Sequence, residues 1–99
     1  MLLVLFAGQS IAQTPWPNRP IKLVASFPAG GASDVLARLL AQKLSDGLGQ
    51  IVTVENRPGA TGNLGHEYAA NLPGDGYTLL LTSSSVLVIN PHMYKRLGY

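Results

Sequence analysis

The stretch "IKLVASFPAGGASDVLARLL" (Ile21–Leu40) joins two different hydrophobic patterns through a loop of small residues. Its first part, "IKLVASF" (Ile21–Phe27), is almost continuously apolar, which is typical of a strand buried on both faces of a sheet. After the loop, "ASDVLARLLAQKLSDGLG" (Ala32–Gly49) has apolar residues at helical spacing and ends at glycines. A buried strand followed directly by an amphipathic helix predicts the start of a β–α–β unit. The residues that recur at this spacing are Val35, Leu36, Leu39, Leu40, Leu44 and Leu48.

The same alternation continues toward the C-terminus. "IVTVEN" (Ile51–Asn56) predicts a second strand, "NLGHEYAANL" (Asn63–Leu72) a shorter helix, and "YTLLLTS" (Tyr77–Ser83) a third strand. Asn90 and Pro91 are typical of the N-cap and first position of a final short helix. Strands that alternate with helices at nearly equal spacing predict an α/β fold, a βαβαβ unit with parallel strands and right-handed crossovers.

The N-terminal residues follow a different pattern. Leu2–Ala7 is an apolar run too short to span a bilayer, and small residues at Ser10 and Ala12 suit signal-peptidase cleavage. We therefore expect residues 1–12 to be an export signal cleaved after Ala12, although the usual basic start is missing. A buried N-terminal strand is the alternative. Residues 13–20 are rich in proline and predict an extended start of the mature chain.

Composition limits the classes of protein that this chain can represent. It has 99 residues, of which 46% are hydrophobic and 12% charged, enough for the core of one small domain or of part of a larger one. The basic residues behind the net charge of +2 are scattered, which argues against nucleic-acid binding. The absence of cysteine excludes disulfides and thiolate metal sites. His66 and His92 have no metal partner at helical spacing, so we expect both to be surface or packing residues.

Three loops follow the predicted strands, and in a parallel sheet they lie at the edge where open α/β sheets bind ligands. They are "FPAGGAS" (Phe27–Ser33), "NRPGATGN" (Asn56–Asn63) and "TSSS" (Thr82–Ser85). Their glycines let an anion approach the backbone N–H groups at a helix start, where the helix dipole favours negative charge. The loops thus predict an anion site, for which a carboxylate is as suitable as a phosphate. A tight turn without a ligand is the alternative.

Several polar residues near these loops have structural interpretations too. Asp34 could accept hydrogen bonds from a ligand, but an acid in a first helical turn more often complements the helix dipole. Asn63 could contact a ligand, although capping the second helix is the more common use. We expect Arg57 to be solvated or paired with a surface acid, and Trp16 and Tyr77 to pack the domain.

Motifs of nucleotide enzymes and hydrolases are absent from these loops. "GATGNLG" (Gly59–Gly65) spaces its glycines one residue off the dinucleotide fingerprint, and Phe27–Asp34 contains no G-K-[ST]. Ser83–Ser85 lack the G-x-S-x-G setting of a nucleophile, and no His–carboxylate pair stands out to activate them. We therefore predict no catalytic residue, no enzyme activity, no cofactor and no metal. A nucleotide-dependent α/β enzyme remains the alternative.

Four motifs in order carry a family resemblance. "RPIKLVASFPAGGASDVLARLLAQKLSDGLGQIVTVENRPGATGNLG", then "PGDGYTLLLTSSS" and "INPHMYKRL", resemble the beginning of the Bug or TctC-type extracytoplasmic solute receptors of tripartite tricarboxylate transporters. The resemblance covers Trp16–Tyr99. It implies a periplasmic, non-enzymatic protein with a two-lobed Venus-flytrap fold. Its partners would be membrane transporter subunits and a small carboxylate: a di- or tricarboxylate, an aromatic acid or an acidic amino acid.

The resemblance also implies where the solute binds. Family members hold it largely through backbone groups and waters at the loops matching Phe27–Ser33 and Gly59–Asn63, with Ser83–Ser85 at the same cleft. Because family members are much longer, we expect residues 21–99 to be the N-terminal part of one lobe, without the second; a truncated relic without independent function is the alternative. The candidate ligand-binding residues are Phe27, Pro28, Ala29, Gly30, Gly31, Ser33, Asp34, Gly59, Gly62, Asn63, Ser83, Ser84 and Ser85.

Overall fold

The computed structural model of the protein describes residues 15–99, so the predicted export signal lies outside the described residues. The order of the strands and main helices confirms the predicted alternation. The first and third strands end two residues earlier than predicted, because Ser26, Phe27, Thr82 and Ser83 already belong to the loops that follow. The elements are β1 (Ile21–Ala25), α1 (Ala32–Leu48), β2 (Val52–Asn56), η1 (Ala60–Gly62), α2 (Asn63–Ala70), β3 (Thr78–Leu81), α3 (Ser84–Val88) and α4 (Asn90–Met93).

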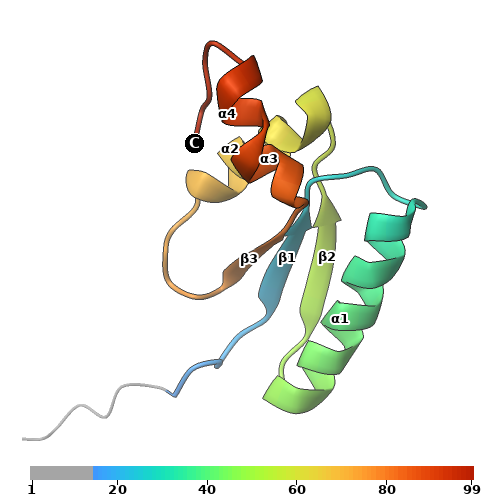
Figure 1. The fold of residues 1–99 in the computed structure, drawn as a ribbon. Helices are drawn as coiled ribbons and strands as arrows, with labels where there is room; N and C mark the ends of the chain where they lie inside the picture. Colours follow the sequence, from blue (N-terminus) through green and yellow to red (C-terminus); the bar gives the residue numbers. More distant parts are fainter. Residues whose placement is uncertain (1–14) are drawn as a thin grey trace, which may run out of the picture.

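The three strands form a parallel sheet in the order β2-β1-β3, with β1 in the centre. The chain passes from β1 to β2 through α1 and then crosses back over β1 to reach β3 through α2. Right-handed crossovers in opposite directions place the two helices on opposite faces of the sheet. Accordingly, α1 contacts β1 and β2, whereas α2 contacts β1 and β3 (Figure 1). The α/β fold with parallel strands is therefore as predicted.

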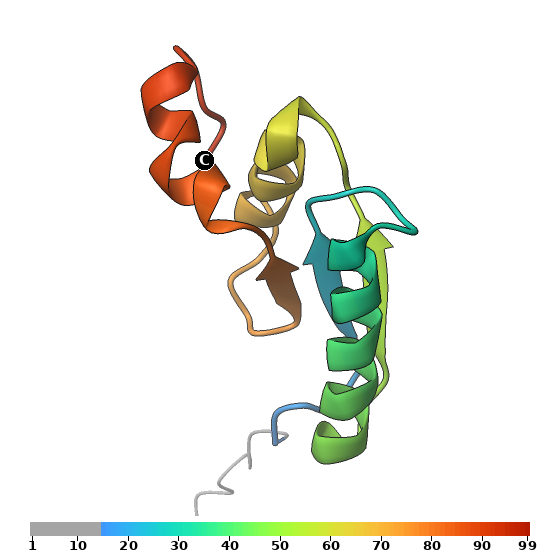
Figure 2. The same cartoon turned by 45° about the vertical axis from the view of Figure 1, so that its right-hand side comes forward.

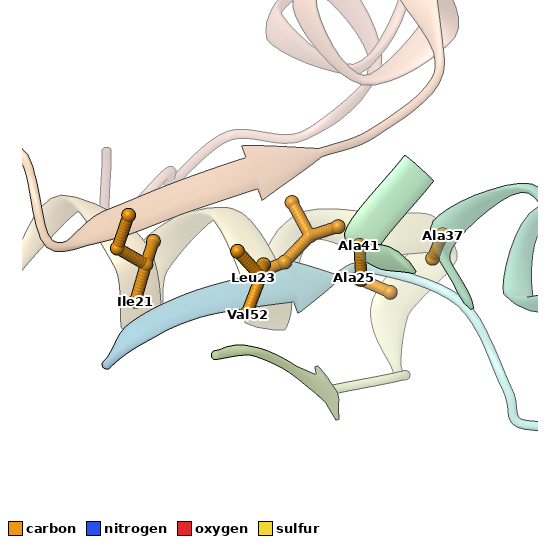
Figure 3. Packing of buried hydrophobic residues seen from close by; sticks show 6 residues of the cluster. All are labelled: Ile21, Leu23, Ala25, Ala37, Ala41 and Val52. Atoms are coloured by element: carbon orange, nitrogen blue, oxygen red, sulfur yellow. The ribbon is translucent and has the colours of Figure 1, made fainter. Parts of the chain in front are cut away.

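The hydrophobic core lies between the sheet and α1. Alternate side chains of β1 point to this face and meet small residues of the helix (Figure 3). The buried members are Ile21, Leu23, Ala25, Ala37, Ala41 and Val52, with exposed fractions of 7% or less.

In the first turns of α1, the apolar residues at helical spacing are not the ones that the helix buries. Val35 and Leu36 are 62% and 61% exposed, and Leu39 and Leu40 are also exposed. The helix instead buries Ala37 and Ala41, whose short side chains allow its axis to approach the sheet closely. The large residues Val35, Leu36, Leu39 and Leu40 therefore form an exposed apolar stripe on α1.

Helix α2 approaches the other face of the sheet through Gly65. A Cβ atom on this residue would lie 2.8 Å from the Cα atom of Ser26 and 2.8 Å from the carbonyl oxygen of Arg57. No side chain fits there without moving the helix, so glycine at this position determines the distance between α2 and the end of β1.

The proline-rich segment before β1 packs at the opposite end of the sheet from the strand-to-helix loops. The indole Nε1 of Trp16 donates to the carbonyl oxygen of Gly76 at 3.2 Å, and the ring lies 6.3 Å from that of Tyr77 between centroids. Tyr77 also packs partly against the core, as predicted, whereas Trp16 is half exposed and packs only on the surface. Among residues 15–99, no helix has the length and apolar character needed to cross a membrane.

Candidate functional site

The three predicted loops lie together at the carboxyl ends of the strands, toward which all three strand arrows point in Figures 1 and 2. They converge on Gly62. A Cβ atom there would lie 2.7 Å from Cγ2 of Val86, which follows β3, and 3.4 Å from Cζ of Phe27, which follows β1. Residues that follow each of the three strands are thus in mutual contact at one point, as the parallel arrangement predicts.

A hollow of about 70 Å³ opens between the ends of β1 and β3. From β1 the chain passes through α1 to β2 on one side, and it returns through α2 to β3 on the other side of β1. The hollow between β1 and β3 therefore lies at the point where the strand order reverses. Open α/β sheets bind ligands at this kind of position. The hollow is lined by Phe27, Ser33, Leu36, Leu81 and Thr82.

The loop after β1 is organised by Asp34. Its Oδ2 atom accepts hydrogen bonds from the backbone N–H of Gly30 and from Nε of Arg38, each at 3.0 Å. Its Oδ1 atom accepts from Nδ2 of Asn56 at 3.0 Å, and the same Nδ2 donates to the carbonyl oxygen of Phe27 at 3.2 Å. The Asp34 side chain therefore links the start of α1, the end of β2 and the loop itself.

These bonds determine the charge state of Asp34 and its availability. The bond from the Gly30 amide, followed by those from Asn56 and Arg38, lowers the pKa of Asp34 to about 2. The residue is a buried carboxylate at neutral pH. Since its oxygens are occupied by protein donors, the structure favours a structural role for Asp34, although the amide that it satisfies is that of Gly30, before the helix, and not one in the first turn of α1. Asp34 also accepts the hydrogen bond of the Gly30 amide, which the sequence predicts as a donor to a ligand.

The loop after β2 has an unusual backbone. Gly59, Ala60, Thr61 and Gly62 all have positive φ angles, of 131°, 48°, 53° and 96°. Glycine adopts such angles freely, but for Ala60 and Thr61 the left-handed conformation costs about 1–2 kcal/mol per residue. Conformations of this kind persist only where surrounding contacts hold them, and they are concentrated at ligand-binding and active sites.

Turn hydrogen bonds hold part of this loop. The carbonyl oxygen of Gly59 accepts from the N–H groups of Gly62 at 3.1 Å and Leu64 at 3.4 Å. Two of the amides at the start of α2 are therefore paired within the loop. The helix begins at Asn63 with Gly62 as its N-cap.

The structure contradicts the capping roles predicted for Asn63 and Asn90. The Asn63 side chain makes no cap hydrogen bond, and its Oδ1 atom accepts from Nδ2 of Asn90 at 2.7 Å and from the Tyr99 hydroxyl at 3.0 Å. Asn90 is the first residue of α4 rather than its N-cap, and its side chain points away from that helix end toward the loop after β2. Both are buried, with 9% and 5% exposure, so long-range pairing outweighs local capping.

The loop after β3 presents serine hydroxyl groups. The Oγ atoms of Ser83 and Ser85 are 2.5 Å apart, and the carbonyl oxygen of Ser83 accepts from the N–H of Val86 at 3.2 Å. The serines therefore lie on the same edge as the glycine loops, and of the three only Ser84 is exposed.

The remaining predicted residues differ in exposure. Pro28, Ala29, Gly30 and Gly31 are exposed at the tip of the first loop, while Phe27, Ser33 and Gly59 are half-buried. Of the thirteen candidates, only Asp34, Gly62 and Asn63 are buried. The binding role of all these residues stays a prediction.

Arg57 is paired, as expected. Its Nη2 atom lies 2.6 Å from Oε1 of Glu55, and its guanidinium group lies 4.0 Å from the centroid of the Tyr68 ring. Lys22 also pairs with Glu55, at 3.0 Å. Burial acts to raise the pKa of Glu55, but hydrogen bonds from the two cations outweigh it and lower that pKa.

His66 is a packing residue, and His92 lies exposed on α4, as the sequence predicts. The ring of His66 is buried against that of Tyr99 at 4.8 Å between centroids, and burial lowers its pKa. Within the described part of the chain, no three His, Cys, Asp or Glu side chains gather to form a metal site.

Sequence reasoning missed the residues that support the loops. Asn56 and Arg38 bind Asp34, and Thr61 is bonded by Asn90 and Tyr94. Thr61 lies inside a loop that the sequence singled out, so its place was detectable. Arg38 follows Asp34 by four residues, the spacing of an ion pair on a helix, so it was detectable as well. Asn56, Asn90 and Tyr94 lie between 22 and 33 residues from their partners, and no local pattern indicates them.

The chain is similar to a family of receptors and to several individual proteins. Residues 36–99 match the family model described as tripartite tricarboxylate transporter family receptor. A UPF0065 protein of Bordetella bronchiseptica is 46% identical over 99 residues, which are 100% of this chain and 29% of that protein. Protein BugT of Bordetella pertussis is 51% identical over 75 residues, covering 76% of this chain and 23% of BugT.

Solved structures show the same similarity. The chain matches Rpa4515 of R. palustris, solved with adipate, with a TM-score of 0.80 and 40% identity over 86% of this chain and 28% of that one. It matches MatC of Rhodopseudomonas palustris, solved with bound malate, with a TM-score of 0.62 and 37% identity over 66% of this chain and 22% of MatC. The present chain thus spans less than a third of the length of these proteins.

Proposed function

The chain belongs to the tripartite tricarboxylate transporter receptor family, and from this membership we propose that its three strand-to-helix loops form one wall of a binding site for a small organic carboxylate. The family is one of solute-binding receptors, and its members are periplasmic binding proteins. The chain would act as a receptor and not as an enzyme.

The observation that carries this proposal is the convergence of the loops on Gly62. Residues following all three strands meet there, beside the hollow between β1 and β3. A small solute placed at this edge reaches backbone from two glycine loops and hydroxyls from the serine loop at once. A single glycine-rich turn would not provide this.

Backbone amides would supply most of the donors. The Gly30 and Gly62 amides are paired within the protein, but Ala32 and Ser33 lie in the first turn of α1, where an N–H group has no intrahelical acceptor. The positive end of the α1 dipole favours a carboxylate at that point. Ser84, exposed on the loop after β3, adds a hydroxyl donor.

The related structures support a carboxylate as the ligand class, since one is described with adipate and another with bound malate. A dicarboxylate, a tricarboxylate, an aromatic acid and an acidic amino acid all present the group that these donors recognise. As a member of this family, the protein would pass its solute to the membrane subunits of a tripartite transporter. Residues 1–12 would direct its export, and residues 21–99 would be the first part of one lobe of a two-lobed receptor.

The test is an amide-resolved titration of the ¹⁵N-labelled chain with adipate and with malate. We expect chemical-shift changes in residues 29–33, 59–63 and 82–85, and none in the return loop of residues 73–76. Hexane-1,6-diol, which has the length of adipate without its charges, is the matched control and should cause no change. ATP and NAD in parallel titrations test the nucleotide alternative, which would gain support if they shifted these residues and the carboxylates did not.

A second experiment measures affinity in a two-lobed context. The chain is joined to the part of the B. bronchiseptica relative that it does not match, and the fusion is titrated by calorimetry with members of each acid class. A closed site removes more of the ligand from water, so tighter binding than in the chain alone is expected. No heat with any of these acids would exclude the proposed substrate class.

A further inference from the structure

We propose that Asn90 is a positioning residue of the binding site, which holds the loop of residues 59–62 in its left-handed conformation. The effect on ligand binding rests on the proposed function, because this loop is one of those expected to contact the carboxylate. The conformational part can be tested without any ligand.

The loop is under backbone strain at two residues. Ala60 and Thr61 have φ angles of 48° and 53°, although neither is glycine, and the stretch of positive φ is continuous from Gly59 to Gly62. Both strained residues are exposed, so packing of their own side chains does not explain the conformation. Contacts from elsewhere in the fold must hold it.

Asn90 provides the most direct of these contacts. Its Nδ2 atom donates to the carbonyl oxygen of Thr61 at 3.2 Å and to Oδ1 of Asn63 at 2.7 Å. One amide group therefore bonds the strained peptide and the first residue of α2, and both of its protons have an acceptor. Asn90 is only 5% exposed, so water does not easily replace these bonds.

Neighbouring residues reinforce this contact. The Thr61 hydroxyl lies 2.8 Å from the Tyr94 hydroxyl and donates to the carbonyl oxygen of Ala60 at 2.7 Å. The Tyr99 hydroxyl contacts Asn63 Oδ1 at 3.0 Å. The segment after β3 thus presents its polar groups to the loop after β2, which accounts for a buried asparagine at the start of such a short helix.

The direction of the hydrogen bonds separates Asn90 from Asn63. At position 90 the side chain must donate, because both of its partners are oxygens. At position 63 it must accept. Asn90→Asp and Asn63→Asp make the same change of shape and charge, but only the first removes a required donor. Even if the Asn63 amide reversed to donate to an aspartate at position 90, the carbonyl oxygen of Thr61 would have no donor.

The first experiment compares these two variants of the full chain by NMR. The φ angles of Ala60 and Thr61 are obtained from scalar couplings and chemical shifts. Amide exchange is measured at Gly62, whose N–H donates to the carbonyl oxygen of Gly59 within the turn. We expect Asn90→Asp to change both φ angles and to accelerate Gly62 exchange by about tenfold, the factor for a hydrogen bond worth 1.4 kcal/mol. Asn63→Asp should keep the loop conformation. Unchanged angles in Asn90→Asp would overturn the proposal.

A second variant separates loop positioning from general stability. Ala60→Gly removes one strained Cβ atom, so the double variant Asn90→Asp/Ala60→Gly should recover part of the lost Gly62 protection. If Asn90 only stabilised α4, glycine at position 60 would have no such effect. Should Asn90→Asp fail to fold, the unmodified chain still decides the matter. Its Asn90 side-chain amide protons should exchange slowly and show contacts to Thr61 and Asn63, whereas fast exchange would contradict the proposal.

The consequence for binding is measured with adipate as the probe. Relative to Asn71→Asp, a charge-matched change at the exposed C-cap residue of α2, Asn90→Asp should weaken the binding of adipate by about tenfold. Equal affinities in the two variants would count against a role in the site. If the unmodified chain binds neither adipate nor malate while Asn90→Asp still releases the loop, the proposed function fails and the positioning role stands.

Discussion

Replacing Gly65 with alanine tests whether the close approach of α2 to β1 determines the geometry of this fold. A Cβ atom at this position would lie 2.8 Å from two backbone atoms, one in Ser26 and one in Arg57. Ordinary contact begins at 3.4 Å, so the helix would have to move away by the difference, about 0.6 Å. Because α2 directly follows the loop of residues 59–62, the displacement would reach the candidate site.

The magnitude follows from two opposing effects. Overpacking against backbone atoms, which cannot rotate away, costs about 3 kcal/mol, at the upper end of the usual range. Alanine in a helix gains about 1 kcal/mol over glycine. The free energy of unfolding should therefore fall by about 2 kcal/mol, which lowers the urea midpoint by about 1 M in a denaturation followed by circular dichroism.

Gly47 provides the matched control for this substitution. It also lies in a helix, α1, but nothing lies within 4 Å of a Cβ atom added to it. Gly47→Ala should gain the helix propensity without the clash and raise stability by about 1 kcal/mol. The two substitutions are chemically identical and should have opposite signs. If Gly65→Ala were as stable as the unmodified chain, the close approach of α2 would not limit the fold.

Three other substitutions test the loops and the core. The pKa of Asp34 is lowered to about 2 in the fold from an ordinary 3.8, so its stabilising effect is present in full above about pH 4 and is lost as the pH falls through 2. Across that range, the urea midpoint should drop less in Asp34→Asn than in the unmodified chain. Gly62→Ala should destabilise by about 2 kcal/mol in thermal melts, since it adds a Cβ at a φ of 96°, 2.7 Å from a methyl group of Val86; an unchanged melting temperature would refute the convergence of the loops. Ser45→Ala removes the hydroxyl that accepts from the N–H of Val52 at 2.9 Å, so it should cost about 1 kcal/mol and accelerate exchange of that amide, whereas Val52 protection equal to that of the unmodified chain would contradict the assignment.

Local patterns predicted where the three loops lie, because such patterns depend on neighbouring residues. The apolar run of Ile21–Ala25 and the glycine-rich turn after it identify a strand and its loop, and parallel strands place such loops at one edge. A structural role for Asp34 was also within reach, since an acid in a first helical turn commonly complements the helix dipole; the bond to the Gly30 amide, before the helix, differs from the expected bonds within the turn. The bond of Asp34 to Asn56 depends on the pairing of β1 with β2 and was not predictable.

The buried face of α1 and the roles of two asparagines, which were predicted to cap helices, differ from the local pattern for a common reason. Hydrophobic spacing favours large residues as the core face, but α1 packs through Ala37 and Ala41 because small side chains allow a closer approach to the sheet. Asn63 and Asn90 look like helix caps when only adjacent residues are considered. Each has a partner 27 residues away that competes successfully for the same side chain.

By itself, the sequence determined that strands and helices alternate, that the strands are parallel, and that glycine and serine loops share one edge. These properties follow from residue spacing and from the handedness of the chain. Only the tertiary structure decided the strand order β2-β1-β3, the contact of the three loops at Gly62, and the left-handed backbone at Ala60 and Thr61. The physical reason is that right-handed crossovers permit β3 on either side of the sheet, and that the strain at residues 60 and 61 is held by Asn90, which only the folded chain brings to them.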